Sequence, residues 1–336
     1  MTHIDLSSSP RDPVDLARRR YLRAGLAAAG AGALGVALPG CASSTVADKE
    51  AAATGHGTEL ILLGTKGGPR VGGARSNPAN VLLVDGAPYV VDCGQGVARQ
   101  LVRAGIPLPQ VHKIFFTHLH SDHDLEYGGL LYSAWAAGLK SKVQVWGPPT
   151  LDAMTRAFMD YMKFDIDIRV DDEGKPYLPD LIETHEFDRD GLVMQDDKVK
   201  VTALRNAHPP IHESFALRFD TPDRSVAFSG DTTYFPPLAD FAKGADVLVH
   251  EVIYVPGVDA MVKRVPNAAT LKEHLLASHT TTEDVGRIAA AAGVDTLVLS
   301  HFVPGDDPTI TDAMWAEGVR KHFKGRIVVG RDLMVI

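Results

Sequence analysis

The stretch Thr117-His118-Leu119-His120-Ser121-Asp122-His123 indicates the fold of this chain. It follows the apolar run Ile114-Phe115-Phe116, so it predicts a strand that ends in a loop of metal-binding side chains. In extended chain the first two histidines point to the same side, and a turn through the Asp-His pair aims two further ligands. A polar strand-end loop without function would explain one histidine, but not three imidazoles and a carboxylate within six positions.

Length and charge narrow the class of protein. With 336 residues and 45% hydrophobic content, the chain can bury a full core, as one large domain or two modest ones. Its formal net charge is -8, and without the five arginines and three aspartates of residues 1–40 it is -10. Because proteins that bind nucleic acids usually show a basic surface, this acidic chain argues against a nucleic-acid partner.

Residues 1–40 are expected to form a twin-arginine-type signal peptide. The run Arg18-Arg19-Arg20-Tyr21-Leu22-Arg23 resembles that export signal, and the uncharged segment 24–38 follows it. This segment is too short and too rich in Ala and Gly to span a membrane, which takes about 20 apolar residues. Its end, Leu38-Pro39-Gly40-Cys41, resembles a lipobox, so Cys41 is the expected lipid-bearing N-terminus. Cleavage at a nearby small residue without lipid is the alternative.

The rest of the chain is expected to be a short tether and one domain. Residues 41–58, rich in Ala, Ser, Thr and Gly, predict a flexible tether, and residues 59–336 predict a single domain. The protein is thus expected to be exported in a bacterium, either periplasmic or anchored as a lipoprotein, with membrane contact only through Cys41. Cys93 is the other cysteine, so we expect no disulfide and interpret Cys93 as a small buried residue.

Local patterns predict several elements of that domain. Asn80 to Asp85 and Pro88 to Asp92 predict a hairpin around the Asp85-Gly86 turn. Helical spacing of apolar residues recurs in three segments, Gly96 to Ala104, Tyr127 to Ala137 and Leu151 to Met162. Residues 165–186 are acidic and contain proline, which favours a long loop that lines a substrate site, or else a solvated excursion.

The second half repeats one arrangement, an apolar strand that delivers a polar residue at its C-terminal end. The four pairs are Lys198 to Leu204 with His208, Ser225 to Ser229 with Asp231, Asp246 to Val249 with His250-Glu251, and Thr296 to Ser300 with His301. Strand ends are rigid, which suits ligands that must be held within a fraction of an ångström. Two halves of mixed strands and helices, with all ligands at one edge, predict an α/β fold of the αββα sandwich type.

The histidine loop carries the His-x-His-x-Asp-His signature and resembles the metallo-β-lactamase superfamily. Further motifs occur in the order of its ribonuclease Z and arylsulfatase-like branch: Leu63-Gly64-Thr65, Asp92-Cys93-Gly94-Gln95-Gly96, Asn206-Ala207-His208, Gly230-Asp231-Thr232, His250-Glu251, Ser278-His279-Thr280-Thr281 and Ser300-His301-Phe302. The resemblance implies an αββα metallo-β-lactamase sandwich over residues 59–336. It also implies one metal ion held by His118, His120 and His208, a second held by Asp122, His123 and His301, and Asp231 as the bridge between them.

Such a ligand set suits hydrolysis. Neutral imidazoles and carboxylates favour Zn²⁺, although manganese or iron could take the same ligands. Two divalent cations roughly 3.5–4 Å apart share a water whose pKa falls toward neutrality, so hydroxide is available at pH 7. The same cations take up charge that develops on a phosphoryl, sulfuryl or acyl oxygen.

The resemblance also implies catalytic residues: His279, Glu251 and, beside its role as a ligand, Asp122. His279 would contact the scissile group or protonate the leaving oxygen, and Glu251 would orient it by accepting its other ring proton. The alternative for His279 is an exposed position before a helix from Glu283 to Ala292 that Thr281 or Thr282 caps. His250 is interpreted as a packing or hydrogen-bonding residue.

The remaining histidines are given no role. His56, His112, His185, His274 and His322 lie in polar surroundings without ligand spacing, and His212 is interpreted as a surface residue although it is near the site in sequence.

The leading functional hypothesis is an exported two-metal hydrolase acting on small phosphodiesters, sulfate esters or related esters. Alternatives are ribonuclease Z-like tRNA 3′ processing, lactonase or β-lactamase-type acyl hydrolysis, and a metal-binding lipoprotein without turnover. Relatives of this type often form dimers, so a homodimer is also expected. The expected partner is a small-molecule ester.

Overall fold

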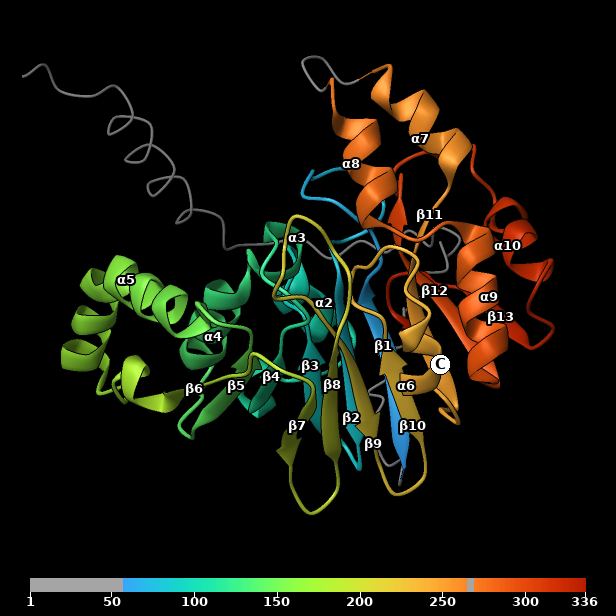
Figure 1. Ribbon diagram of the computed structural model, residues 1–336. Helices are drawn as coiled ribbons and strands as arrows, with labels where there is room; N and C mark the ends of the chain where they lie inside the picture. The colour runs from blue at the N-terminus through green and yellow to red at the C-terminus, as the bar shows by residue number, and fades with distance from the viewer. Residues whose placement is uncertain (1–56, 265–268) are drawn as a thin grey trace, which may run out of the picture. The chain divides into compact units, whose positions relative to one another are not determined.

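Two β-sheets packed face to face form the centre of the structure (Figure 1). The computed structural model describes residues 57–264 and 269–336, all within one compact unit, Glu50–Ile336. The predicted signal peptide, Cys41 and all of the predicted tether except its last two residues lie outside the described residues. In the described part of the chain, no helix combines the length and apolar composition that crossing a membrane requires.

The first sheet mixes antiparallel and parallel strands. In spatial order it contains β14 (Met334–Val335), β1 (Thr58–Gly64), β2 (Ala79–Val84), β3 (Ala87–Val91), β4 (Lys113–Phe115), β5 (Val143–Gly147) and β6 (Ile182–Glu186). The predicted hairpin is confirmed as β2 and β3, with Asp85 and Gly86 at φ values of 48° and 80°. A two-residue turn of left-handed conformation matches the twist of paired strands, which explains the Asp-Gly sequence.

The second sheet supplies most of the distant site residues. In spatial order it contains β13 (Arg326–Val329), β12 (Thr296–Val303), β11 (Val247–Ile253), β10 (Ser225–Phe228), β9 (Phe215–Asp220), β8 (Lys200–Arg205) and β7 (Gly191–Gln195). Strands β10 to β13 are parallel, and every residue of β11 and β12 is buried. Burial on both faces explains why these two segments are nearly continuous apolar runs.

Apolar side chains from both sheets fill the space between them. Phe115 stacks on Trp146 at 4.7 Å between ring centroids and meets Phe219 of the opposite sheet edge-on at 5.2 Å. Because Phe115 is the last residue of β4, this packing fixes the strand that leads into the histidine loop.

Helices cover the two outer faces, so the predicted αββα sandwich is confirmed. The first sheet shares an apolar cluster with α2 (Val97–Arg103), α4 (Tyr127–Ala136) and α5 (Leu151–Glu173). The second shares one with α6 (Pro237–Phe241), α9 (Thr282–Ala292) and α10 (Asp312–Arg320). Three further helices are α3 (Ser121–Asp124), α7 (Val255–Val262) and α8 (Leu271–Ser278), and short 3₁₀ turns occupy Leu108–Gln110 and Leu178–Leu181.

The long loop predicted for residues 165–186 is wrong. Helix α5 continues to Glu173, and β6 then pairs with β5. Ile166 is fully buried, and Arg169 forms ion pairs with Asp165 and Glu173, each four residues away along the helix. These pairs at helical spacing explain how an acidic segment stays helical.

Candidate metal centre

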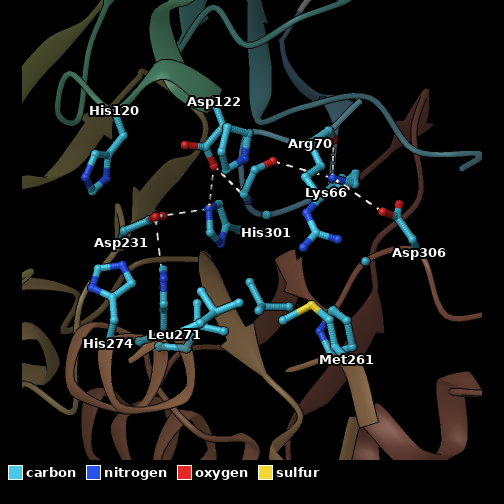
Figure 2. Close-up of a pocket in the computed structure, with 18 of the residues that line it drawn as sticks. Lys66, Arg70, His120, Asp122, Asp231, Met261, Leu271, His274, His301 and Asp306 are labelled. Atoms are coloured by element: carbon cyan, nitrogen blue, oxygen red, sulfur yellow. Dashed lines mark hydrogen bonds and ion pairs between the residues drawn. The ribbon is translucent and has the colours of Figure 1, made fainter. Parts of the chain in front are cut away.

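All seven residues predicted as metal ligands meet at one edge of the two sheets. Figure 2 shows four of them, His120, Asp122, Asp231 and His301, around one cavity. The histidine loop reaches this edge from β4, and the remaining ligands come from the second sheet.

Asp92 holds the histidine loop at two points. Its carboxylate accepts hydrogen bonds from the Thr117 backbone N–H at 2.9 Å and from the Thr117 hydroxyl at 3.0 and 3.1 Å. It also lies 2.9 Å from His123 Nδ1. These hydrogen bonds hold the shape of the loop, and the turn of α3 directs Asp122 and His123 back toward the first histidine.

The second sheet delivers its site residues in two ways. His208 and Asp231 follow the ends of β8 and β10, as predicted, whereas His301 and Glu251 lie inside β12 and β11. The register of these two strands shifts beside Glu251, and His301 has a left-handed φ of 46°. A local irregularity of this kind re-aims a side chain without ending the strand. Gly67 leaves room for it, because a Cβ there would come within 2.7 Å of the His301 ring.

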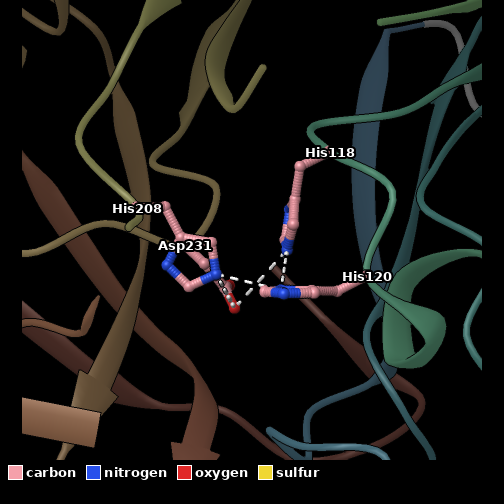
Figure 3. A group of neighbouring side chains, drawn as sticks. All are labelled: His118, His120, His208 and Asp231. Carbon is pink, nitrogen blue, oxygen red and sulfur yellow. Dashed lines mark hydrogen bonds and ion pairs between the residues drawn. The ribbon is translucent and has the colours of Figure 1, made fainter. Parts of the chain in front are cut away.

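The ligand atoms form two adjacent groups. His118, His120, His208 and Asp231 make up the first group (Figure 3), and Asp122, His123 and His301 make up the second. Within each group, the atoms that could bind a cation all lie within 4.8 Å of one another. His279 lies close enough to Asp231 and His301 to form a third such group with them.

Asp231 lies between the two groups. Its Oδ2 is 3.8 Å from both His118 Nε2 and His208 Nε2, while its Oδ1 is 3.4 Å from His123 Nε2. Oδ2 is also 3.0 Å from His301 Nε2. One buried carboxylate therefore faces imidazoles of both groups, which is the geometry required of a bridging ligand.

The protons on these rings point away from the centre. His208 Nδ1 lies 2.8 Å from the Ser278 carbonyl, which can only accept a proton, so the lone pair of His208 sits on Nε2. The Asp92 carboxylate fixes His123 in the same way. The Nε2 atoms of His123 and His301 are buried and make no hydrogen bond with any described residue. Buried ring nitrogens without a hydrogen-bond partner, gathered around one carboxylate, are expected where a cation binds, so these residues fit a pair of divalent metal ions.

The electrostatics of the first group agree with this fit. Burial lowers the pKa of His118 well below its ordinary range and lowers the pKa of His120 to about 4, so both rings are neutral. Burial raises the pKa of Asp231, but the charges of His301 and His123 outweigh it and hold the pKa well below its ordinary value. Neutral imidazoles with an ionised carboxylate are the forms that bind metal. In the second group burial lowers the pKa of each ring, but the charge of Asp231 outweighs it and raises the pKa of His123 well above its ordinary value and the pKa of His301 to about 10, so a bound cation would replace the protons of these two rings.

His279 is buried beside the ligands and is held by Glu251. Its Nδ1 lies 3.1 Å from Glu251 Oε1, which also accepts the backbone N–H groups of Thr232 and Thr280 at 3.0 and 3.2 Å. Burial lowers the pKa of His279, but the charge and hydrogen bond of Glu251 outweigh it and raise the pKa above its ordinary value. Thr281 caps α9 as predicted, yet His279 is not exposed before that helix.

His250 points away from both ligand groups. It is buried, its Nδ1 lies 2.7 Å from the Glu251 carbonyl, and it belongs to neither group. The interpretation as a packing and hydrogen-bonding residue therefore agrees with its position.

The ligands open into a cavity of about 540 Å³. His120, Asp122, Asp231, His279 and His301 line one end. Helices α7 and α8, the segment 303–307 and the loop 66–70 line the rest (Figure 2). None of residues 165–186 lines it, which excludes the substrate-loop role considered for that segment.

Lys66 fixes the loop on one side of this cavity. Its side chain is almost fully buried, lies 3.5 Å from Asp306, and donates hydrogen bonds to the carbonyls of Arg70 and Gly68. The Gly68 backbone N–H in turn donates to Asp122 at 2.8 Å. The loop therefore links the outer part of the cavity to a metal ligand.

Three residues of the cavity carry no signal that sequence patterns could detect. Lys66 and Arg70 follow a recognised motif but have no ligand spacing, and His274 was assigned to polar surroundings. The structure brings His274 into the cavity wall, where its Nδ1 lies 3.4 Å from the Ser278 hydroxyl. Only the position of α8 relative to the ligands reveals this.

Asp92→Asn is expected to weaken metal binding while the fold is kept. The amide keeps the shape of the side chain but cannot accept from both Thr117 and His123 as a carboxylate does. Loss of such an orienting carboxylate typically costs 10–100-fold in metal affinity. Competition with a fluorescent zinc chelator measures this. Asp196→Asn, which alters a carboxylate paired with Lys113 away from the cavity, is the matched control, and equal affinities in the two variants would contradict the role of Asp92.

Comparison with known proteins adds sequence relatives. Residues 88–302 match the family described as beta-lactamase superfamily domain. Ribonuclease Z of Mycobacterium marinum (strain ATCC BAA-535 / M) is 32% identical over 282 residues, which cover 82% of this chain and 96% of that protein. Ribonuclease Z of Mycobacterium bovis (strain BCG / Pasteur 1173P2) is 30% identical over 278 residues, with coverage of 82% and 96%.

Solved structures share the fold at lower identity. The metallo-beta-lactamase fold protein YhfI from Bacillus subtilis matches with a TM-score of 0.62 at 18% identity, covering 83% of this chain and 98% of that one. The short form of human tRNase Z matches with a TM-score of 0.59 at 22% identity, with coverage of 83% and 98%.

Proposed function

Because this chain belongs to the metallo-β-lactamase superfamily of hydrolases and has ribonucleases Z among its relatives, we propose that it is an exported two-metal hydrolase of small phosphodiesters, sulfate esters or related esters. The metal ligands proposed are His118, His120, Asp122, His123, His208, Asp231 and His301, and Zn²⁺ is the ion that the donor set favours. His279 and Glu251 are the proposed catalytic pair. Asp122 is proposed both as a metal ligand and as a catalytic residue.

One observation carries this proposal: His279, held by Glu251, lies in the wall of the cavity into which the ligand groups open. An imidazole beside the ligands but outside both groups is suited to act on the substrate. Opening of a lactam or lactone does not require this additional pair, so the pair favours esters with a poorer leaving group.

The reaction can be followed through the residues of this chain. Two bound cations would supply an activated water and would neutralise the charge that develops on the reacting oxygens. Glu251 accepts a hydrogen bond from His279 Nδ1–H, which fixes the ring. Nε2 is then the nitrogen available to the substrate. His279 is then positioned to give a proton to the leaving oxygen. Asp122 accepts a hydrogen bond from the Gly68 N–H, which links loop 66–70 to the ligands.

A second candidate function is processing of RNA. It is favoured by the relatives, which are named ribonuclease Z and align with 82% of this chain. These relatives weaken the argument from charge against a nucleic-acid partner. The acidic balance of the chain, with 42 acidic and 34 basic residues, still favours a small substrate, because binding of RNA depends on neutralising many phosphates.

A substrate panel tests the proposal. The zinc-loaded protein is expected to cleave bis-p-nitrophenyl phosphate or p-nitrophenyl sulfate, to lose turnover when a chelator removes the metal, and to regain it when Zn²⁺ is restored. Nitrocefin, a lactone and a pre-tRNA complete the panel. Turnover confined to the lactam or lactone would remove the proposal, and cleavage of the pre-tRNA alone would favour the second candidate.

The proposed location rests on residues outside the described part of the chain. Arg18-Arg19-Arg20 and the lipobox-like end at Cys41 support export with lipid attachment. Mass spectrometry of the mature N-terminus checks this, since an unprocessed residue 1 would contradict export by this route. A homodimer is part of the same proposal and is checked by sedimentation velocity.

A further inference from the structure

The cavity has a second end that the proposed chemistry does not use. It lies between α7 and α8 on one side and loop 66–70 on the other, and it is continuous with the ligand end. Its helical side presents Met261 and Leu271 (Figure 2) together with Leu275. Val303 and Pro304, at and after the end of β12, also line the cavity. Leu275 and Val303 are buried members of one small apolar cluster, against which Met261 and Leu271 pack.

Charges near this end are largely compensated. Asp306 lies 3.5 Å from Lys66, and Asp307 lies 3.4 Å from Arg264. Among the described residues, Arg70 is the one arginine lining the cavity with no ion pair, and it lies on the loop opposite the helices. An apolar surface without free carboxylates suits an uncharged apolar group, and it offers no row of cations for a nucleic-acid backbone.

The position of His279 indicates that the leaving group of the substrate is the part closest to this apolar surface. His279 directly follows α8, and its backbone N–H donates to Leu275, one turn earlier, at 3.1 Å. The leaving oxygen must lie beside His279 to receive its proton. Because Leu271 and Leu275 line the same cavity as His279, a group attached to that oxygen can extend along α8, toward these two leucines.

We propose that the surface formed by Met261, Leu271, Leu275, Val303 and Pro304 binds the leaving group of the ester, and that this group is compact, uncharged and apolar, such as an aryl ring. The inference rests on the proposed function, which it makes more specific. A cavity of about 540 Å³ that also contains the ligand end has the size of a small-molecule site. Leu271 and Met261 are therefore residues that determine specificity.

Binding of two phosphonates tests this without turnover. Phenylphosphonate and methylphosphonate carry the same anionic head, and only the first has an apolar ring. We expect the zinc-loaded full chain to bind phenylphosphonate at least tenfold more tightly in calorimetry, since burial of a ring in an apolar site typically gives 10–100-fold. Leu271→Trp is expected to reduce this preference below threefold by filling the site, while binding of methylphosphonate stays within twofold.

The same helix offers a matched control. Leu276 lies on α8 but does not line the cavity and is 39% exposed, so Leu276→Trp is expected to keep the full preference. Met261→Trp repeats the test from α7 and serves if Leu271→Trp does not fold. Equal binding of the two phosphonates by the unaltered protein, failure of both to bind, or a preference retained in both cavity variants would overturn the inference.

Turnover of bis-p-nitrophenyl phosphate, measured in parallel, separates the two proposals. Turnover without a preference for the phenyl ring would reject only the leaving-group site. A preference for the phenyl ring without turnover of any ester in the panel would reject the proposed function and leave this surface as an aryl-binding site without a leaving-group role.

Discussion

Asp231→Ala is expected to abolish turnover and to lower the metal content of the purified protein. The carboxylate is buried and faces imidazoles of both ligand groups at 3.0–3.8 Å, so its loss affects both metal positions at once. We expect a fall of about 10⁴-fold or more in kcat/KM. When catalytic residues act together, removal of one central member loses nearly all of their joint contribution to the rate. Metal content is expected to fall from two ions to one or fewer in elemental analysis.

The design of this experiment separates loss of metal from loss of fold. Asp231→Asn keeps the volume of the side chain and removes its charge, so it is expected to lose metal with little change in the circular dichroism spectrum. Asp196→Ala is the control for removal of a partly buried carboxylate, because Asp196 pairs with Lys113 at 2.7 Å outside the cavity. Two retained metal ions in Asp231→Ala would contradict the bridging role, whatever the rate.

The histidine loop could be predicted from local sequence because its geometry is local. A strand, an alternation of two residues and a tight turn determine where His118, His120, Asp122 and His123 point, and each of these appears in consecutive residues. The partners His208, Asp231 and His301 are 85 to 178 positions beyond His123, and no local pattern links them to the loop. Their assignment depended on the family resemblance, and the structure brings them to the same edge.

The cavity wall could not be predicted for a related reason. Met261, Leu271 and His274 lie on two short helices whose own patterns resemble those of ordinary amphipathic helices. They line the cavity because α7 and α8 pack against the end of β12, which is a tertiary contact. The error in α5 has another origin: acidic composition suggested a loop, whereas ion pairs at helical spacing and one buried face stabilise a helix.

His279→Ala is expected to lower kcat by 10²–10⁴-fold while both metal ions remain bound. A positioned general acid typically contributes this factor, and Glu251 holds His279 in one orientation at 3.1 Å. The effect is expected in kcat more than in KM, because the proton is needed in the transition state and the ring contributes little to binding of the ester. A substrate with a better leaving group is expected to lose less rate, since its departure depends less on protonation.

The metal content of His279→Ala distinguishes a general acid from a metal ligand at this position. His279 also lies near Asp231 and His301 in an arrangement that could bind an ion, so a direct ligand role is a defined alternative. If His279 were a ligand, its substitution would lower the metal content of the protein, and the loss of rate would not depend on the leaving group.

Glu251→Gln provides the second test. It weakens the hydrogen bond that holds His279 without changing the ring, and this variant is expected to lose part of the rate but no metal. His322→Ala, at a half-buried histidine outside the cavity, is the control and is expected to change neither quantity. A rate within about twofold of the unaltered protein in His279→Ala would rule out the general-acid role, because a positioned general acid contributes about 10²–10⁴-fold.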